Sequence, residues 1–129
     1  MKNNILILFF LSAAFYSCKK GPGEGGQTTI LGKIWEQRYL GGQHNDTLDR
    51  WAIEQDVYII YGNELSYGNR TRTGLNGLYE FKYLRAGDYT VYFYSDSTIY
   101  NKKLIRRVVS IPDDGITDLG TDTIIKLLN

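Results

Sequence analysis

Hydrophobic and polar residues alternate along most of the chain after Thr28, which is the pattern of β-strands with one buried face. Short runs rich in isoleucine, valine, tyrosine and threonine are separated by clusters of glycine, asparagine and aspartate. No stretch of helical length repeats its apolar residues every three or four positions. The pattern therefore predicts an all-β domain of about seven strands. They are expected at Thr29–Arg38, Asp56–Gly62, Tyr67–Thr73, Leu78–Leu84, Tyr89–Ser95, Lys103–Ile111 and Thr121–Leu128.

The alternation also predicts which side chains face the core. In four of the strands one alternate set is apolar, and the opposite set contains charged or polar residues. Arg107 is the exception, because it stands at an inward position of its strand. Two sheets with one apolar face each are expected to pack into a sandwich. The predicted inward residues are Val57, Ile59, Tyr61, Tyr79, Phe81, Tyr83, Tyr89, Val91, Phe93, Ile105, Val109 and Ile111.

Turn residues stand where the strands are expected to end. Asn76-Gly77 and Ala86-Gly87-Asp88 separate consecutive strands, and Pro112-Asp113-Asp114-Gly115 follows another. Leu40–Gln55 is the one long connection, and connections longer than about 12 residues often carry function. The sequence therefore predicts an insertion or crossover loop there.

The N-terminal residues 1–17 have the features of an export signal. A short polar, basic start precedes an apolar run of about a dozen residues, too short for a spanning helix of ~20 residues. The run ends at Ser17-Cys18, and Lys19-Lys20 follows, an arrangement that resembles lipoprotein signals of the Bacteroidetes type. That resemblance implies acylation of Cys18 as the new N-terminus. Gly-rich residues 18–27 are then predicted to be a flexible tether, and residues 28–129 the folded domain.

Composition excludes several classes of protein. The chain has 15 Lys and Arg against 14 Asp and Glu, one His and one Cys. Near-neutral charge gives no general attraction to nucleic acid, and one His with one Cys cannot build a zinc site. His44 is predicted to be a solvated loop residue, because no second histidine or nucleophile accompanies it. No metal or cofactor is predicted. Four aspartates near the C-terminus leave calcium binding open, with capping of turns as the alternative: Asp113, Asp114, Asp118 and Asp122.

The segment Thr73–Val91 resembles the motif of carboxypeptidase regulatory-like domains. That family reads Thr-Asp-x-x-Gly-x-Tyr-x-Phe-x-x-Leu-x-x-Gly-x-Tyr-x-Val, with Gly74 standing here in place of Asp. Ile30-Leu31-Gly32-Lys33-Ile34 is similar to the first strand of the family. The resemblance implies a prealbumin-like Greek-key sandwich, an accessory role and no catalytic residues. The matching residues are Gly77, Tyr79, Phe81, Leu84, Gly87, Tyr89 and Val91.

Aromatic residues outside the predicted core are the candidate binding residues. Exposed aromatic rings stack on sugars or anchor protein interfaces, and cross-strand packing is the structural alternative. These candidates are Trp35, Trp51, Tyr58, Tyr92 and Tyr94. Three Asp-Ser/Thr sequences resemble O-glycosylation acceptors of Bacteroidetes, at Thr47, Ser97 and Thr123.

These features together predict a non-catalytic lipoprotein of the cell envelope. Its sandwich is expected to contact another envelope protein through the aromatic residues and the Leu40–Gln55 loop. A glycan-binding module of a polysaccharide-uptake system is the alternative. The lipid is expected to hold the protein on a membrane, and Lys19 after Cys18 favours the outer membrane by resemblance to bacterial sorting rules. No nucleic-acid partner is expected.

Overall fold

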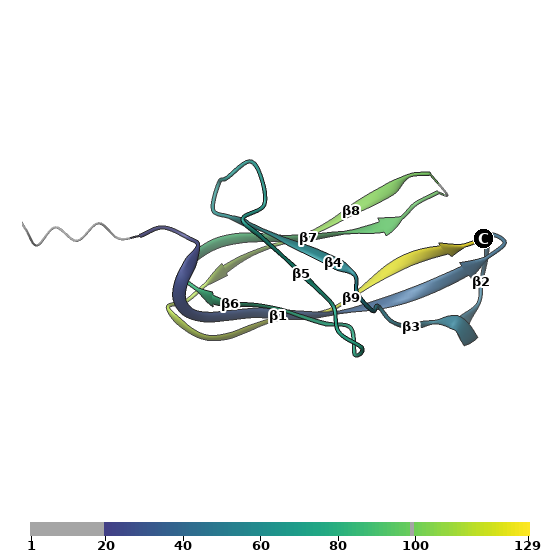
Figure 1. Ribbon diagram of the computed structural model, residues 1–129, viewed down its shortest axis with the longest axis horizontal. Helices are drawn as coiled ribbons and strands as arrows, with labels where there is room; N and C mark the ends of the chain where they lie inside the picture. The colour runs from purple at the N-terminus through teal and green to yellow at the C-terminus, as the bar shows by residue number, and fades with distance from the viewer. Residues whose placement is uncertain (1–19, 99) are drawn as a thin grey trace, which may run out of the picture.

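The computed structural model describes residues 20–98 and 100–129, and this part of the chain is an all-β sandwich of two sheets (Figure 1). Within these residues there are nine strands and one short 3₁₀ helix, η2 (Asp46–Leu48). The predicted fold class is confirmed. Seven of the strands correspond to the predicted ones, and two further strands of two residues each lie inside the predicted Leu40–Gln55 loop.

The first sheet is built on β1 (Glu24–Leu40), the longest strand of the described chain with 17 residues. β9 (Asp114–Leu128) runs parallel to it, with pairs from Gln27–Asp114 to Leu40–Leu128. Three strands pair with β1 antiparallel in succession, and since β9 occupies one edge of β1, they share the other. They are β6 (Leu78–Leu84), β3 (Arg50–Trp51) and β2 (Gln43–His44).

The second sheet has four antiparallel strands in the order β5-β4-β7-β8. β7 is central and is paired on both edges, with β4 on one side and β8 on the other. β5 and β8 are the edge strands of this sheet. The strands are β4 (Asp56–Tyr61), β5 (Asn69–Arg72), β7 (Gly87–Asp96) and β8 (Lys102–Ile111).

The tether predicted for residues 18–27 is wrong from Glu24 onward, because those residues form the start of β1. The segment before β1 is bound by the side chains of Arg85 and Tyr89 and by the backbone N–H of Arg85. The Arg85 N–H donates to the Gly23 carbonyl at 2.8 Å, and Arg85 Nε donates to the Gly21 carbonyl at 2.7 Å. The Gly23 N–H donates to Tyr89 Oη at 2.7 Å. Glycine content predicts flexibility, but these contacts satisfy the backbone groups and fix the segment. Cys18 and the predicted signal lie outside the described residues.

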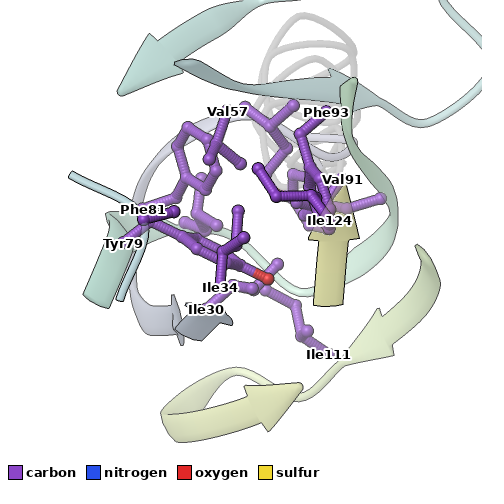
Figure 2. Packing of buried hydrophobic residues seen from close by; sticks show 13 residues of the cluster. Ile30, Ile34, Val57, Tyr79, Phe81, Val91, Phe93, Ile111 and Ile124 are labelled. Atoms are coloured by element: carbon purple, nitrogen blue, oxygen red, sulfur yellow. The ribbon is translucent and has the colours of Figure 1, made fainter. Parts of the chain in front are cut away.

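The core between the sheets contains residues from both (Figure 2). Val57 and Ile59 of β4 and Val91 and Phe93 of β7 are fully buried, as the alternation predicted. The core extends from Ile30 to Ile124, so residues 20–129 contain all of it and are expected to fold without the preceding residues. The other buried apolar residues are Ile34, Ala52, Tyr79, Phe81, Leu84, Tyr89 and Ile111, with Tyr61, Ile105, Val109 and Leu119 packed against them.

Tyr83 is the one inward prediction that is wrong. Its φ of 60° places it in the left-handed region, and its side chain is 71% exposed. The strand pairing shifts at this point, since Leu84 is opposite Thr28 of β1 and Phe81 is opposite Ile30, so that β6 has one extra residue between the two pairs. This bulge turns Tyr83 outward and brings Leu84, only 1% exposed, into the core in its place. Leu84, one of the residues that match the family motif, is therefore part of the core.

Arg107 joins the two sheets, which explains the charged residue at an inward position of β8. Its guanidinium forms a two-point ion pair with Asp122 of β9, with Nε donating to Oδ2 at 3.1 Å and Nη2 donating to Oδ1. Asp122 is 5% exposed, whereas half of the Arg107 side chain reaches solvent. The carboxylate is therefore buried with its partner in place, and the pair closes the sandwich where β8 and β9 approach each other.

Replacing Tyr79 by Phe is expected to leave the protein as stable as before or to raise the free energy of unfolding by up to about 1 kcal/mol. Tyr79 Oη is buried and has no hydrogen-bond partner among the described residues. Burial raises the pKa of Tyr79, so its phenol is neutral at physiological pH. Urea unfolding followed by circular dichroism measures the change. A decrease of more than 1 kcal/mol in the free energy of unfolding would show that the Tyr79 hydroxyl has a hydrogen-bond partner.

Candidate functional site

The strongest candidate for a contact surface is a cluster of four tyrosines on the outer face of the second sheet. Val57 and Ile59 point into the core, so Tyr58 between them points outward. The same alternation in β7 places Tyr92 and Tyr94 outward. The predicted orientation of these three tyrosines is confirmed. Tyr67, from the connection between β4 and β5, packs against Tyr58 and completes what we call the tyrosine cluster.

The rings of the tyrosine cluster contact one another across the strands. Tyr58 and Tyr92 are stacked, with centroids 5.0 Å apart and an interplanar angle of 13°. Tyr67 meets Tyr58 edge-on at 5.0 Å, and Tyr94 meets Tyr92 edge-on at 6.0 Å. Aromatic pairs in these geometries stabilise each other by about 0.5–1.5 kcal/mol beyond area burial. Cross-strand packing, the structural alternative, is therefore real, and it also holds the rings in fixed positions.

The cluster remains accessible at its margins. Tyr94 is 42% exposed, Tyr67 is 49% exposed, and Leu104, opposite Tyr94 on β8, is 49% exposed. Tyr92 lies deeper: burial, followed by the neighbouring phenols of Tyr94 and Tyr58, raises its pKa above the usual value. The surface thus presents rigid aromatic rings and an apolar side chain to solvent, which are features of protein interfaces.

Two arginines flank the stacked rings. Arg70 of β5 is opposite Tyr58, Tyr58 is opposite Tyr92, and Tyr92 is opposite Arg106 of β8. Residues that are directly opposite in antiparallel strands have their side chains on the same face. These four side chains therefore form one row across all four strands of the sheet.

The β7–β8 hairpin diverges from the β1–β9 pair at one end of the sandwich (Figure 1). A groove lined by residues of β4, β7, β8 and β9 lies beside the cluster. It has a volume of about 410 Å³. Tyr58 and Tyr94 form part of its wall. Carboxylates, amines and one amide face it as well. The remaining lining residues are Glu54, Gln55, Asp56, Asp96, Lys102, Ile124, Ile125 and Lys126.

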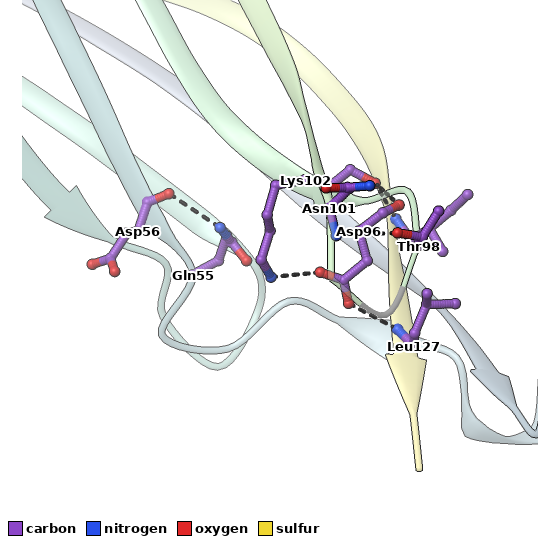
Figure 3. Close-up of polar contacts among 9 residues, drawn as sticks. Gln55, Asp56, Asp96, Thr98, Asn101, Lys102 and Leu127 are labelled. Carbon is purple, nitrogen blue, oxygen red and sulfur yellow. Dashed lines mark hydrogen bonds and ion pairs between the residues drawn. The ribbon is translucent and has the colours of Figure 1, made fainter.

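Asp96 connects the two sheets at this groove (Figure 3). Its Oδ1 forms an ion pair with Lys102 Nζ, and its Oδ2 accepts the Leu127 N–H at 2.9 Å. Ser95 Oγ accepts the Ile125 N–H at 2.8 Å. Burial acts to raise the pKa of Asp96, but the Lys102 ammonium and the Leu127 amide outweigh it and hold the pKa below its usual value. The free edge of β9 is thereby capped by side chains of β7.

The two tryptophans lie on the other side of the molecule. Ile34 and Glu36 of β1 are buried, so Trp35 points to the outer face of the first sheet, and its strand partner Trp51 shares that face. The two rings meet edge-on at 5.1 Å, and Lys33 Nζ lies 5.0 Å from the centre of the Trp51 ring. The five predicted binding residues therefore form two separate groups on opposite faces of the sandwich. Trp35 and Trp51 are on the first sheet, and Tyr58, Tyr92 and Tyr94 are on the second.

The charged candidates take part in local structure. His44 is exposed, and its Nε2 lies 2.9 Å from Asp49 Oδ2. The pKa of Asp49 is lowered, mainly because its carboxylate accepts a hydrogen bond from the Arg38 N–H and also because of its hydrogen bond with His44. Asp118 Oδ1 accepts the Gly120 N–H at 2.8 Å, which is turn capping. Within residues 20–98 and 100–129 no three acidic, His or Cys side chains gather as a metal site requires.

The three predicted O-glycosylation residues are on the surface. Thr47 is in η2, and its Oγ1 donates to Asn45 Oδ1 at 2.6 Å. Ser97 lies in the connection between β7 and β8, and Thr123 is opposite Trp35 on the outer face of the first sheet. All three are exposed, so a modifying enzyme has access to each, and their glycosylation stays a prediction.

Neither the comparison with protein-family models nor the comparison with curated proteins gives a match for this chain. The resemblance to carboxypeptidase regulatory-like domains therefore stays a prediction. In the described part of the chain, no helix combines the length and the apolar character needed to span a membrane.

Sequence reasoning did not identify Tyr67, Arg70 or Arg106 as site residues. Alternation in Asn69–Arg72 puts Arg70 and Arg72 on one face of their strand, which is a usable signal. This alternation does not predict which residue of another strand lies beside Arg70. That depends on the register between strands, and the register comes only from the folded structure.

Proposed function

We propose that this protein is a non-catalytic, lipid-anchored component of the cell envelope, and that its sandwich binds another envelope protein through the tyrosine cluster. The observation that carries the proposal is the fixed, partly exposed group of four tyrosine rings on the outer face of the second sheet. Rigid aromatic side chains lose little conformational entropy on binding and are enriched at interface hot spots.

The anchor is part of the same proposal. Cys18 would carry the acyl chains and hold the domain at a membrane, with the outer membrane favoured by Lys19. The bound segment Gly21–Glu24 supports a short distance between anchor and domain, because few residues then separate Cys18 from the first contacts with Arg85 and Tyr89. A short connection restricts the partner to proteins close to the membrane surface.

Replacing Tyr92 by Ala is expected to reduce contact with the partner at least tenfold. Tyr92 packs against both Tyr58 and Tyr94, and its loss removes the ring on which Tyr58 stacks. The measurement is in-cell photo-crosslinking of the full-length chain in its natural host, with the crosslinker at Tyr67 and the captured protein identified by mass spectrometry. One dominant envelope protein, lost with Tyr92→Ala, is the expected result.

Tyr83→Ala is the matched control, since Tyr83 is another exposed tyrosine but lies on β6 of the first sheet. It should leave the crosslink unchanged. Equal crosslinking by both variants would contradict a role of the tyrosine cluster. Circular dichroism must show that both variants remain folded.

The groove favours a second candidate, a glycan-binding module. Tyr58 and Tyr94 beside carboxylates and the Gln55 amide combine an aromatic surface with hydrogen-bonding groups, as sugars require. Residues 20–129 would then be retarded in gels that contain a polysaccharide, and Tyr94→Ala would abolish the retardation. This result without any protein crosslink would favour the second candidate over the first.

A further inference from the structure

We infer that the partner surface bound by the tyrosine cluster is acidic, with two carboxylates that pair with Arg70 and Arg106. This inference rests on the proposed function and specifies the chemistry of the partner. The row Arg70, Tyr58, Tyr92 and Arg106 carries it, because the row places a positive charge at each end of the stacked rings.

These two arginines differ from three other basic residues of the same sheet, which are in ion pairs. On the same sheet Arg72 pairs with Asp56 at 3.0 Å, Lys102 pairs with Asp96, and Arg107 pairs with Asp122. Among the residues that the structure describes, no carboxylate lies within 4.0 Å of Arg70 or Arg106, and both side chains are exposed. Their charges are available for groups outside the domain.

The register sets the spacing of the charges. Arg70 and Arg106 are on the two edge strands, three strand intervals apart, which is a distance of about 14 Å between backbones. In an extended peptide, residues i and i+4 are separated by about 13–14 Å and point to the same side. An extended acidic segment that crosses the strands therefore places two carboxylates on the arginines and an apolar residue at i+2 on the tyrosine rings.

Discrete carboxylates fit this face better than a continuous polyanion. Asp56 lies two residues from Tyr58 on the outer side of β4, and Asp88 lies on the same side of β7. Asp56 is compensated by its pairing with Arg72, but Asp88 is in no ion pair among the described residues. A nucleic acid or an anionic membrane spread over the face would meet the negative charge of Asp88, whereas a protein surface with separate carboxylates would avoid it. Because the arginines are exposed, we expect them to determine selectivity and association rate.

The test uses blocked peptides and residues 20–129, which contain the whole core. The acidic peptide is Glu-Ser-Ile-Ser-Glu, and its neutral counterpart is Gln-Ser-Ile-Ser-Gln. NMR titration should show shifts centred on the amides of Tyr58 and Tyr92, at least fivefold tighter binding of the acidic peptide, and weakening as salt increases. The inference is wrong if the two peptides bind alike, if neither perturbs these amides, or if polygalacturonate binds in preference to the acidic peptide.

The double variant Arg70→Gln/Arg106→Gln should remove the preference for the acidic peptide. Lys103→Gln is the matched control. Lys103 is an exposed cation of β8, but it is opposite the buried Ser95 and so belongs to the other face of the strand. It should leave the preference intact. Equal losses in the control and the double variant would overturn the inference, because they would indicate general attraction to positive charge.

In-cell crosslinking of the full-length chain separates this inference from the proposed function. Loss of the captured protein with Arg70→Glu/Arg106→Glu as well as with Tyr92→Ala supports both. Loss with Tyr92→Ala alone leaves the proposed function standing and overturns the acidic partner. Retention with all the variants overturns both.

Discussion

Replacing Phe93 by Ala is expected to lower the free energy of unfolding by about 3–5 kcal/mol, the largest single effect in this protein. Phe93 is fully buried, and it belongs to β7, which is paired on both edges. Its ring lies against Tyr79 of the opposite sheet, with centroids 6.5 Å apart. The substitution removes the ring from the contact between sheets and leaves a cavity that the surrounding strands cannot close. Since small domains are stable by only about 5–15 kcal/mol, this variant is expected to be close to unfolding.

Chemical denaturation of residues 20–129, followed by circular dichroism, measures this change. Phe93→Leu is the conservative comparison and should lose less, because most of the volume stays filled. Tyr100→Ala is the surface control, as Tyr100 is 92% exposed, and it should change stability by less than about 0.5 kcal/mol. A loss below 1 kcal/mol for Phe93→Ala would contradict the packing described for the two sheets.

Removing Arg107 is expected to have the second largest effect. Arg107→Ala leaves the Asp122 carboxylate buried, at 5% exposure, without its two-point partner. Breaking a buried ion pair costs about 3–5 kcal/mol, and partial access of water to the Arg107 side of the pair reduces the expectation to about 2–3 kcal/mol. The expected outcome is a shift of the urea midpoint with an unchanged slope, because the fold itself persists.

Removing the charge of Asp122 instead of Arg107 is expected to lower the free energy of unfolding by less. Asp122→Asn leaves a guanidinium that is half exposed and can turn toward water, so a loss of about 1 kcal/mol is expected. The double variant Arg107→Ala/Asp122→Asn should be more stable than Arg107→Ala alone, since no buried charge then remains. If the double variant is no more stable than Arg107→Ala, the cost arises from lost packing of the arginine stem and not from the unpaired carboxylate.

Some properties of this protein follow from local sequence. Alternation of period two identified the seven main strands and the inward positions of Val57, Ile59, Val91 and Phe93, because the side-chain period of a strand needs no knowledge of its neighbours. The same rule placed Tyr58, Tyr92 and Tyr94 outward. Asn76-Gly77 marked a turn, and Gly77 indeed has a φ of 72°.

Other properties depended on the backbone contacts made after folding. Tyr83 fits the inward alternation, yet the bulge opposite β1 turns it outward. The glycine-rich residues 18–27 are predicted to be a tether, yet the carbonyls of Gly21 and Gly23 accept hydrogen bonds from Arg85 and extend the ordered part of the chain. Local composition predicts neither the outward direction of Tyr83 nor the binding of Gly21 and Gly23, because the hydrogen-bond partners are far away in the sequence.

The sequence by itself determined the fold class, the main strands and the inward or outward direction of most side chains, since these follow from local periodicity. Only the tertiary structure decided which side chains stand together. It separated Trp35 and Trp51 from the tyrosines by placing them on different sheets, paired Arg107 with Asp122, and aligned Arg70 and Arg106 with the stacked rings. The physical reason is register: a shift of one residue between strands would reverse the face of every side chain, and the register is fixed by core packing across the whole domain.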